Sequence, residues 1–581
     1  MSTRSAVRRL VCPAYVLIAI ALLTGCVRMP TDGPVEESPA SASTEEFPGI
    51  SFDPRPPRPG ETPTEVVNGF LEAMRATPIS LTTARQFLSS AARDTWSPEK
   101  QIITYDDLGT RRGTTTARIS MSDVNLYDAR GTWDRSVPQK ELRLSLVEED
   151  GQWRVDSLPD ALVVPESWFD DWYQRVSLYF FDPTSEVLVP EPIFVPRGEQ
   201  LASSLVSSLL APVPDDERDV LRSWFPPGTT QGLMPVKSGI AEVSLTGDPE
   251  AFDEDTVARM RAQLEWTLRQ DPDIRAVQLS IGGRSFGSTG VAGTSDPATA
   301  YDPDGRRTTA ELFALDDGLL VRGELGRLEE TIGPLGQEPS GARSIGVDVA
   351  GSQVAAVSAD GTGLLVAQVD GPGSEVAEVL AGASDLQRPS WDYRERIWVL
   401  DRAAGRARVL VVVDGRAGEV TVPGVSGRDV REVLVSRDGT RLVALVRGPA
   451  RDRVVTSRVR HDADGQVLGA TVPRVLPLSG VDEPRIRDIG WRSPTAVSVL
   501  SYINDDLLAG VRTVSVDGSP GDLTPPDSTS RVRGPVRSLV SAPVEGGAVY
   551  ALAGRQIADL SRPERSLADL PSGLASLTYV G

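Results

Sequence analysis

The first folded part of the chain opens with apolar residues at helical spacing. Thr62, Pro63 and Glu65 match the pattern of a helix N-cap, a first-turn proline and a capping box. Apolar residues then recur every three or four positions up to Met74. This pattern predicts a helix that begins at residue 63, and we expect a second short helix over residues 84–92.

The apolar period changes to two after these helices. Leucines alternate with polar residues from 140 to 149, Asp150-Gly151 supplies a turn, and Trp153 and Val155 continue the alternation. The pattern predicts a β-hairpin, and helices followed by an antiparallel sheet indicate an α+β domain over residues 61–165. This domain is similar to the cone-shaped nuclear-transport-factor-2-like (NTF2-like) fold. We expect its interior to be packed, because no convergent set of polar residues is visible.

A second α+β domain is predicted over residues 166–290. Two strands precede a helix within 198–214, a second helix covers 256–270, and a last strand ends at the tight turn Gly282-Gly283. The order of the segments LVSSLLAPVP, FPPGT and AEVSLTG resembles the GerMN domain of sporulation proteins and lipoproteins. No catalytic residues are implied by that resemblance.

Beyond residue 300 the helical period disappears and a repeat replaces it. Eight Asp-Gly pairs mark candidate hairpin turns, namely Asp304-Gly305, Asp317-Gly318, Asp360-Gly361, Asp370-Gly371, Asp414-Gly415, Asp438-Gly439, Asp464-Gly465 and Asp517-Gly518. A unit of apolar strand, polar turn and apolar strand recurs five times, and aligning the second strands superimposes Val354, Ile397, Leu442, Val497 and Val549. These intervals of 43 to 55 residues predict the blades of a β-propeller over residues 300–581. The hairpin at 310–324 is expected to complete the last blade, and a pair of β-sandwiches is the alternative.

The N-terminal apolar run has the features of an export signal. Three arginines precede residues 10–23, a run shorter than the roughly 20 residues of a membrane-spanning helix. The run ends in a sequence that looks like the lipobox of bacterial lipoproteins, formed by Leu23, Thr24, Gly25 and Cys26. That resemblance implies that residues 1–25 are a signal peptide, and that Cys26 carries an S-diacylglycerol group and an N-acyl chain such as palmitate. An ordinary signal with an incidental cysteine is the alternative.

The segment after the lipobox has the composition of a tether. Residues 26–60 are rich in Pro, Ser, Thr and Glu and poor in apolar side chains. Such a segment cannot bury enough surface to offset its ordering entropy, so we expect it to be disordered.

Composition restricts the chemistry that the chain can perform. The formal net charge of −21 at pH 7 argues against a nucleic-acid partner and leaves the lipid anchor as the means of membrane attachment. Cys12 is lost with the signal, so the mature chain can form neither an internal disulfide nor a thiolate metal site. The single histidine, His461, belongs to a segment that we interpret as an exposed loop. We therefore predict no cofactor, no metal site and no catalytic residue, and we expect that the chain is not an enzyme.

Three acidic clusters could suggest metal binding. The run Asp253, Glu254 and Asp255 is better interpreted as the cap of the second helix in its domain. The pairs Asp302 with Asp304 and Asp462 with Asp464 lack the further oxygens of a calcium loop, so turns are the preferred interpretation.

The order of lipobox, acidic tether, small α+β domain, GerMN-like domain and propeller resembles the LpqB family of actinobacterial lipoproteins. The resemblance covers nearly all of the mature chain. It implies an accessory lipoprotein on the extracytoplasmic face of the cell membrane, associated with the MtrA–MtrB two-component system. Its partner would be the extracytoplasmic domain of the sensor histidine kinase, and it would affect cell-wall growth and division.

Two other functions stay open from the residues alone. A protein that binds a cell-wall glycan or a solute would use the central funnel of the propeller, where the aromatic residues to consider are Trp391, Trp398 and Trp491. A role of these tryptophans in the blade cores is nevertheless favoured. A cell-wall hydrolase would need a pair of carboxylates, and no pair stands out from the acidic background. A deep aromatic funnel would favour a glycan, and a shallow charged rim would favour a protein partner.

Overall fold

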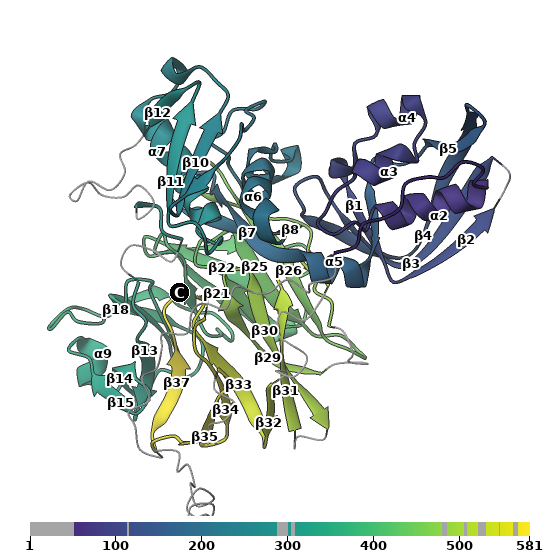
Figure 1. The fold of residues 1–581 in the computed structure, drawn as a ribbon. Helices are drawn as coiled ribbons and strands as arrows, with labels where there is room; N and C mark the ends of the chain where they lie inside the picture. Colours follow the sequence, from purple (N-terminus) through teal and green to yellow (C-terminus); the bar gives the residue numbers. More distant parts are fainter. Residues whose placement is uncertain are drawn as a thin grey trace, which may run out of the picture. The chain divides into compact units, whose positions relative to one another are not determined.

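The structure is a computed structural model that describes residues 51–112, 115–286, 300–303, 308–478, 485–504, 508–520, 530–544, 546–561 and 568–581 (Figure 1). Phe52 to Gly581 form one compact unit. The signal peptide, the lipobox, residues 26–50 of the tether and the Asp304-Gly305 turn lie outside the described residues. Among the described residues, no helix is long and apolar enough to cross a membrane.

The N-terminal domain consists of short helices against a six-stranded sheet. Its helices are α2 (Pro63–Ala73), α3 (Thr82–Gln86) and α4 (Ser90–Thr95). Helix α5 (Glu166–Trp172), the first element beyond residue 165, packs Trp168 and Phe169 into the same core. Its strands are β1 (Ile102–Tyr105), β2 (Asp107–Arg112), β3 (Thr116–Tyr127), β4 (Trp133–Glu149), β5 (Gln152–Ser157) and β6 (Leu162–Pro165). They follow the order β5-β4-β3-β1-β6, with β2 paired to β3 and with β1 and β6 parallel.

The start of α2 and the predicted hairpin are confirmed. The backbone N–H of Thr62 donates to Glu65 Oε2 at 2.8 Å and the N–H of Glu65 donates to Thr62 Oγ1, which is the capping box. The hairpin consists of β4 and β5, and both turn residues, Asp150 and Gly151, have positive φ, as a two-residue turn of this type requires.

Two expectations for this region are wrong. The helix predicted over residues 84–92 is divided into α3 and α4, because residues 87–89 pair with strand β5 through the backbone of Val155. The tether does not stay unstructured as far as residue 60, because Phe52 exchanges backbone hydrogen bonds with Thr77.

The second domain has the helices and strands that the sequence predicts. Its elements are β7 (Tyr173–Phe181), β8 (Leu188–Pro196), α6 (Leu201–Leu210), β9 (Val236–Lys237), β10 (Ile240–Leu245), α7 (Glu254–Leu268), β11 (Ala276–Ile281) and β12 (Arg284–Phe286). Strands β7 and β8 form a two-stranded sheet, and the others follow the order β12-β11-β10-β9 with β10 and β11 parallel. The apolar faces of α6 and α7 meet in one core, built around Leu205, Leu209, Met260 and Leu264.

The acidic run at the start of α7 is a helix cap. Asp253 is the N-cap residue, and its Oδ1 accepts from the N–H of Thr256 at 2.8 Å. No group of three or more His, Cys, Asp or Glu residues that could hold a metal occurs among the described residues.

Six blades make up the C-terminal region within the described residues, of which five have four strands and the third has five. The first blade consists of β16 (Ser344–Val347), β17 (Gln353–Val357), β18 (Leu364–Gln368) and β19 (Ala377–Leu380), and the second of β20 (Ser390–Trp391), β21 (Ile397–Asp401), β22 (Arg408–Val413) and β23 (Arg416–Val420). The third consists of β24 (Val430–Val435), β25 (Arg441–Val446), β26 (Arg453–His461) and β27 (Val467–Ala470), and β28 (Arg474–Val475) also pairs with β26. The last three are β29 (Ile486–Ser493), β30 (Ala496–Asn504), β31 (Leu508–Ser515) and β32 (Ser530–Arg533); β33 (Val536–Ser541), β34 (Val549–Ala553), β35 (Gln556–Asp559) and β36 (Ala568–Asp569); and β37 (Leu574–Thr578), β13 (Leu312–Asp316), β14 (Leu319–Glu324) and β15 (Arg327–Glu330). A short helix, α9 (Pro334–Gln337), follows β15.

The blades close into a propeller. The innermost strands β16, β20, β24, β29, β33 and β37 contact one another in succession, and β37 contacts β16 again. Strand β37 from the C-terminus pairs with β13, so the hairpin predicted at 310–324 does complete the last blade. The five residues aligned from the sequence all lie on the second strand of their blades, which confirms the repeat.

The three tryptophans of the propeller belong to its core. Trp391 and Trp398 are 2% exposed and Trp491 is 7% exposed. The indole N–H of Trp391 donates to the carbonyl of Gly346, and that of Trp491 donates to the carbonyl of Val435. Each of these two hydrogen bonds joins the innermost strands of neighbouring blades.

Candidate functional site

The hairpin of β7 and β8 joins the second domain to the propeller. At its turn, Asp182 Oδ2 accepts from the hydroxyl of Tyr393 at 2.8 Å. On β7, the guanidinium of Arg175 donates to the carbonyl of Thr495 at 3.0 Å. On β8, Glu191 binds two arginines of the third blade. The hairpin is therefore attached to the propeller at three points.

Glu191 is the centre of a buried ion cluster. Arg441 Nη2 donates to Glu191 Oε1 at 2.8 Å, and Arg441 Nη1 donates to the carbonyl of Pro190 at 2.9 Å. Arg458 Nη2 donates to the other carboxylate oxygen. Burial alone would raise the pKa of Glu191, but Arg441 and Arg458 hold that pKa below its ordinary value. Glu191 therefore stays ionised and cannot act as a general acid near neutral pH.

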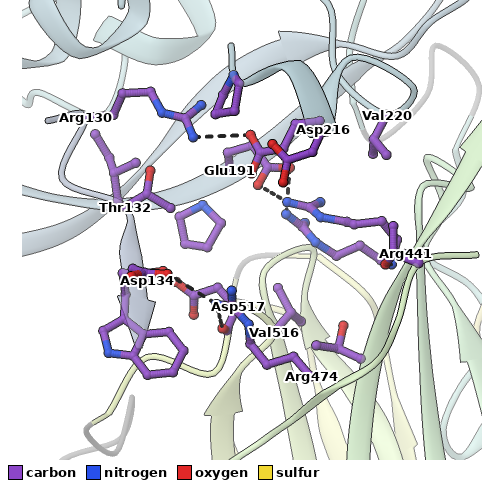
Figure 2. Close-up of a pocket in the computed structure, with 18 of the residues that line it drawn as sticks. Arg130, Thr132, Asp134, Glu191, Asp216, Val220, Arg441, Arg474, Val516 and Asp517 are labelled. Atoms are coloured by element: carbon purple, nitrogen blue, oxygen red, sulfur yellow. Dashed lines mark hydrogen bonds and ion pairs between the residues drawn. The ribbon is translucent and has the colours of Figure 1, made fainter. Parts of the chain in front are cut away.

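A cavity of about 420 Å³ opens beside this cluster (Figure 2). Its walls come from the segment 128–134 of the N-terminal domain, from β7, β8 and residues 214–220 of the second domain, and from residues 441–517 of the propeller. The volume falls within the range of about 300–1,000 Å³ that is common for small-ligand pockets. Figure 2 shows Arg130, Glu191, Arg441 and Asp517 around the same opening.

The N-terminal domain contributes one wall of this cavity through a tight turn. Arg130 is buried and contacts Asp128 at 3.3 Å and Glu217 of the second domain at 3.2 Å. Burial would lower the pKa of Arg130, but these two carboxylates raise it. Gly131 has a φ of +83°, and its backbone approaches Phe194 so closely that a Cβ would lie 2.1 Å from the carbonyl oxygen. Only glycine fits this contact between the two domains.

The lining of the cavity is mainly charged and polar. Its described lining contains no histidine, cysteine or lysine. The carboxylates of Glu191 and Glu217 are engaged with arginines. Arg474 lies over the ring of Trp133 and donates to the carbonyl of Asp517 at 2.9 Å, which closes the side of the cavity between propeller and N-terminal domain.

The centre of the propeller is narrow. The cavity between its innermost strands has a volume of about 50 Å³ and is lined by residues including Pro389, Leu434 and Trp491. The C-terminus lies at this centre, where Gly581 N–H donates to the carbonyl of Val347 and Arg437 donates to the carbonyl of Val580. Because a sugar-sized ligand needs several times this volume, the described centre does not match a deep aromatic funnel.

The interpretation of His461 as a residue of an exposed loop is wrong. It is the last residue of β26 and is 4% exposed, and its backbone N–H donates to the backbone carbonyl of Asp219 in the second domain. Burial, and after it the nearby charge of Arg396, lower the pKa of His461 to about 4. The tertiary contact with the second domain, which the sequence did not reveal, is the reason for this burial.

The acidic pair that follows His461 forms a turn, as expected. Asp462 Oδ1 accepts from the N–H groups of Asp464 and Gln466. Cys26 and the other lipobox residues lie outside the described part of the chain, so their predicted roles stay predictions.

Sequence reasoning did not identify the ion cluster around Glu191. A signal for it existed, because Glu191 interrupts the apolar strand of residues 188–196 and Arg441 begins an otherwise apolar strand. A charge at such a position is rarely buried unless it is paired. The partners could not be named, because they are some 250 residues apart along the chain.

Comparisons with known proteins agree with this architecture. The family model described as "Lipoprotein LpqB, N-terminal domain" matches residues 56–170, "Sporulation and spore germination" (Germane) matches 177–286, and "Lipoprotein LpqB beta-propeller domain" matches 318–566. Similar proteins include Lipoprotein LpqB of Streptomyces coelicolor (26% identical, 90% of each chain covered) and of Thermobifida fusca (27% identical, 82% of this chain and 85% of the other). Lipoprotein LpqB of Mycobacterium tuberculosis is 29% identical, over 84% of this chain and 87% of the other.

Solved structures give weaker likenesses. The tandem GerMN domains of the sporulation protein GerM from Bacillus subtilis are 25% identical with a TM-score of 0.18, and cover 21% of this chain and 45% of that chain. A prolyl endopeptidase is 16% identical with a TM-score of 0.30, and covers 46% of this chain and 49% of that chain. These scores add nothing to the architecture described above. The family models and the curated relatives, which together span nearly all of the described chain, show that the chain belongs to the LpqB family of lipoproteins.

Proposed function

We propose that this lipoprotein is anchored on the extracytoplasmic face of the cell membrane and modulates a two-component sensor kinase by binding its extracytoplasmic domain. The observation that carries the proposal is the exposure of three apolar residues at the outer side of the third blade, namely Leu468 on β27, Val475 on β28 and Val472 in the connection between these strands. Their exposed fractions are 54%, 50% and 80%. Exposed apolar side chains such as these offer apolar contact area to a protein partner.

The rest of the architecture supports a binding function. The two α+β domains and the propeller form one compact unit. The cluster of Glu191, Arg441 and Arg458 joins the second domain to the propeller. The narrow propeller centre favours a protein partner over a glycan bound in a funnel. We include in the proposal that the chain is not an enzyme, that residues 61–165 have an NTF2-like fold, and that the domain limits are 61–165, 166–290 and 300–581. The effect on cell-wall growth and division would follow from the altered kinase signalling.

The experiment titrates residues 52–581 against the extracytoplasmic domain of the kinase. We expect binding that weakens as salt rises, because the chain carries a net charge of −21. Val472→Asp should weaken binding at least about tenfold, which corresponds to about 1.4 kcal/mol of binding free energy. The loss of a central interface contact usually costs more than this. The matched control is Ile332→Asp, since Ile332 is 54% exposed and follows β15 in the sixth blade.

The competing functions give different results. Absence of binding at low salt, together with normal phosphorylation of the response regulator in a deletion strain, would refute the proposal. Turnover of a cell-wall glycan by the same preparation would instead identify a hydrolase, and saturable glycan binding would identify a glycan-binding lipoprotein.

The membrane anchor has its own test. Cys26→Ala should block lipidation and processing, because the diacylglycerol group supplies the two acyl chains needed for stable membrane attachment. Fractionation of cells, combined with mass spectrometry of the N-terminus, measures the outcome. A Cys26→Ala chain that stays in the membrane fraction with normal size and without lipid would contradict the assignment.

A further inference from the structure

Three turns of the propeller share the sequence pattern Ser-x-Asp-Gly-Thr/Ser and one pattern of hydrogen bonds. They are Ser358-Ala-Asp360-Gly-Thr362, Ser436-Arg-Asp438-Gly-Thr440 and Ser515-Val-Asp517-Gly-Ser519. In each turn, Oδ1 of the aspartate accepts from the hydroxyl two residues before it and from the N–H and hydroxyl two residues after it. The turn itself therefore uses only one carboxylate oxygen.

Asp517 differs from the other two aspartates at its second oxygen. Asp517 Oδ2 is buried and has no hydrogen-bond partner within the described residues, whereas neither Asp360 nor Asp438 has such an atom. The side chain of Asp517 is 9% exposed and lines the cavity between the three domains. Asp517 Oδ1 also lies 4.0 Å from Arg175 Nη2. A buried polar oxygen such as Oδ2 is costly unless a donor or a cation binds it.

A second atom of opposite charge borders the same cavity. Arg458 uses Nη2 to bind Glu191, but its Nη1 is buried without a hydrogen-bond partner among the described residues. Arg458 Nη1 can donate to an anion, and Asp517 Oδ2 can accept from a cation. The cavity of about 420 Å³ therefore offers one unused acceptor and one unused donor to the same occupant.

We propose that this cavity binds a small zwitterion, an amino acid or short peptide whose carboxylate contacts Arg458 and whose ammonium group contacts Asp517. Two charge-assisted hydrogen bonds of this kind would satisfy both buried atoms. The ring of Trp133 and the apolar residues Ile193 and Val516 would contact the rest of the ligand.

The charges around the cavity select among zwitterions. Six carboxylates and four arginines line it, and Asp216 at its border is exposed. Figure 2 shows Asp134 and Asp216 facing the opening that Arg130 and Glu191 border. The excess of carboxylates favours a ligand with an additional amino group, so L-lysine is the appropriate probe.

The test is calorimetric titration of the detergent-solubilised full chain with L-lysine, up to about 10 mM. L-lysinamide, which lacks the carboxylate, and Nα-acetyl-L-lysine, which lacks the α-ammonium group, serve as comparison probes. We expect lysine to bind at least about tenfold more tightly than either, because each comparison probe loses a charged hydrogen bond.

Variants assign the two contacts. Asp517→Asn keeps an oxygen for the turn but removes the charge, so it should weaken lysine binding at least about tenfold and leave the binding of Nα-acetyl-L-lysine little changed. Asp360→Asn is the matched control, because Asp360 makes the same turn outside the cavity, and it should bind lysine like the unmodified chain. Arg458→Lys should weaken lysine binding without changing that of lysinamide.

Any one of three results would overturn the proposal. These are no heat of binding with lysine, equal affinities for lysine and lysinamide, or an Asp517→Asn chain that melts like Asp360→Asn and binds lysine without loss.

Discussion

At the scale of single residues, charges placed in apolar strands decide how the domains meet. Arg441 begins β25, a strand whose other residues are apolar, and its side chain is 2% exposed against Glu191 of the second domain. His461 ends β26 and contacts the same domain through its backbone. Burying either side chain without a partner would lower the free energy of unfolding. The stability of both sites therefore depends on the neighbouring domain.

Arg441→Met tests the ion cluster. The substitution leaves Glu191 buried with Arg458 as its remaining arginine, so we expect the free energy of unfolding to fall by about 3 kcal/mol. The measurement is chemical denaturation of residues 52–581. Arg343→Met is the control, because Arg343 pairs with Asp385 with both side chains about one third exposed, and it should cost less than about 1 kcal/mol. Equal losses in the two variants would contradict the role assigned to Arg441.

His461→Gln tests the buried histidine through pH. The pKa of His461 is about 4 in the folded chain and 6.5 in its ordinary state. Between pH 6.5 and 4 the unfolded chain binds a proton at this site and the folded chain does not, so stability should fall as the pH is lowered through this window.

The readout is the pH dependence of the unfolding midpoint. Subtracting the profile of His461→Gln from that of the unmodified chain leaves the contribution of His461, because the facing charged groups Asp182, Asp462, Arg394 and Arg396 are common to both chains. A difference profile that is flat between pH 6.5 and 4 would show that His461 is not buried in its neutral form.

At the scale of elements, local signals start helices but long-range pairing decides where they stop. The capping box sets the first residue of α2 as the sequence predicts. The next apolar stretch does not form one helix, because its middle residues pair with β5 and Ser89 caps a new helix, accepting from the N–H of Ala92 at 3.1 Å. Helical spacing alone could not show this interruption, since the pairing strand lies more than 60 residues away.

Thr62→Ala tests the cap of α2. It removes the oxygen that accepts from Glu65 N–H, so we expect a loss of about 1 kcal/mol in the free energy of unfolding. Thr95→Ala is the matched control, because Thr95 lies in α4 and its exposed hydroxyl donates only to helix carbonyls. The control should change stability by less than about 0.5 kcal/mol. A loss for Thr95→Ala as large as for Thr62→Ala would show that the capping box is not the cause.

At the scale of the whole molecule, one strand from the C-terminus closes the propeller. Strand β37 pairs with β13, about 260 residues earlier, and contacts β16 and β33 of the two neighbouring blades. Its loss would leave the sixth blade without its innermost strand.

Deletion of residues 574–581 tests this closure. It removes β37 and the contacts of Val580 and Gly581 at the propeller centre. We expect a loss above about 4 kcal/mol, the size that marks the removal of a core element, and a broadened unfolding transition by circular dichroism. Deletion of residues 1–50 is the control, because these residues lie outside the compact unit, and it should leave the midpoint unchanged. A sharp transition at the normal midpoint after removal of 574–581 would mean that the ring does not depend on this strand.

Periodicity along the chain was sufficient to predict the α+β domains, the GerMN-like helices and the register of the propeller repeat. These features depend on local rules, because an apolar face recurs at 3.6 or 2 residues wherever an element is buried on one side. The number of blades, the division of residues 84–92 into two helices and the burial of His461 depended on contacts between residues far apart in sequence. The same holds for the cavity and its unused atoms on Arg458 and Asp517. The sequence shows that Asp517 can make the same turn as Asp360, but only the packing of three domains decides that one of its oxygens is buried.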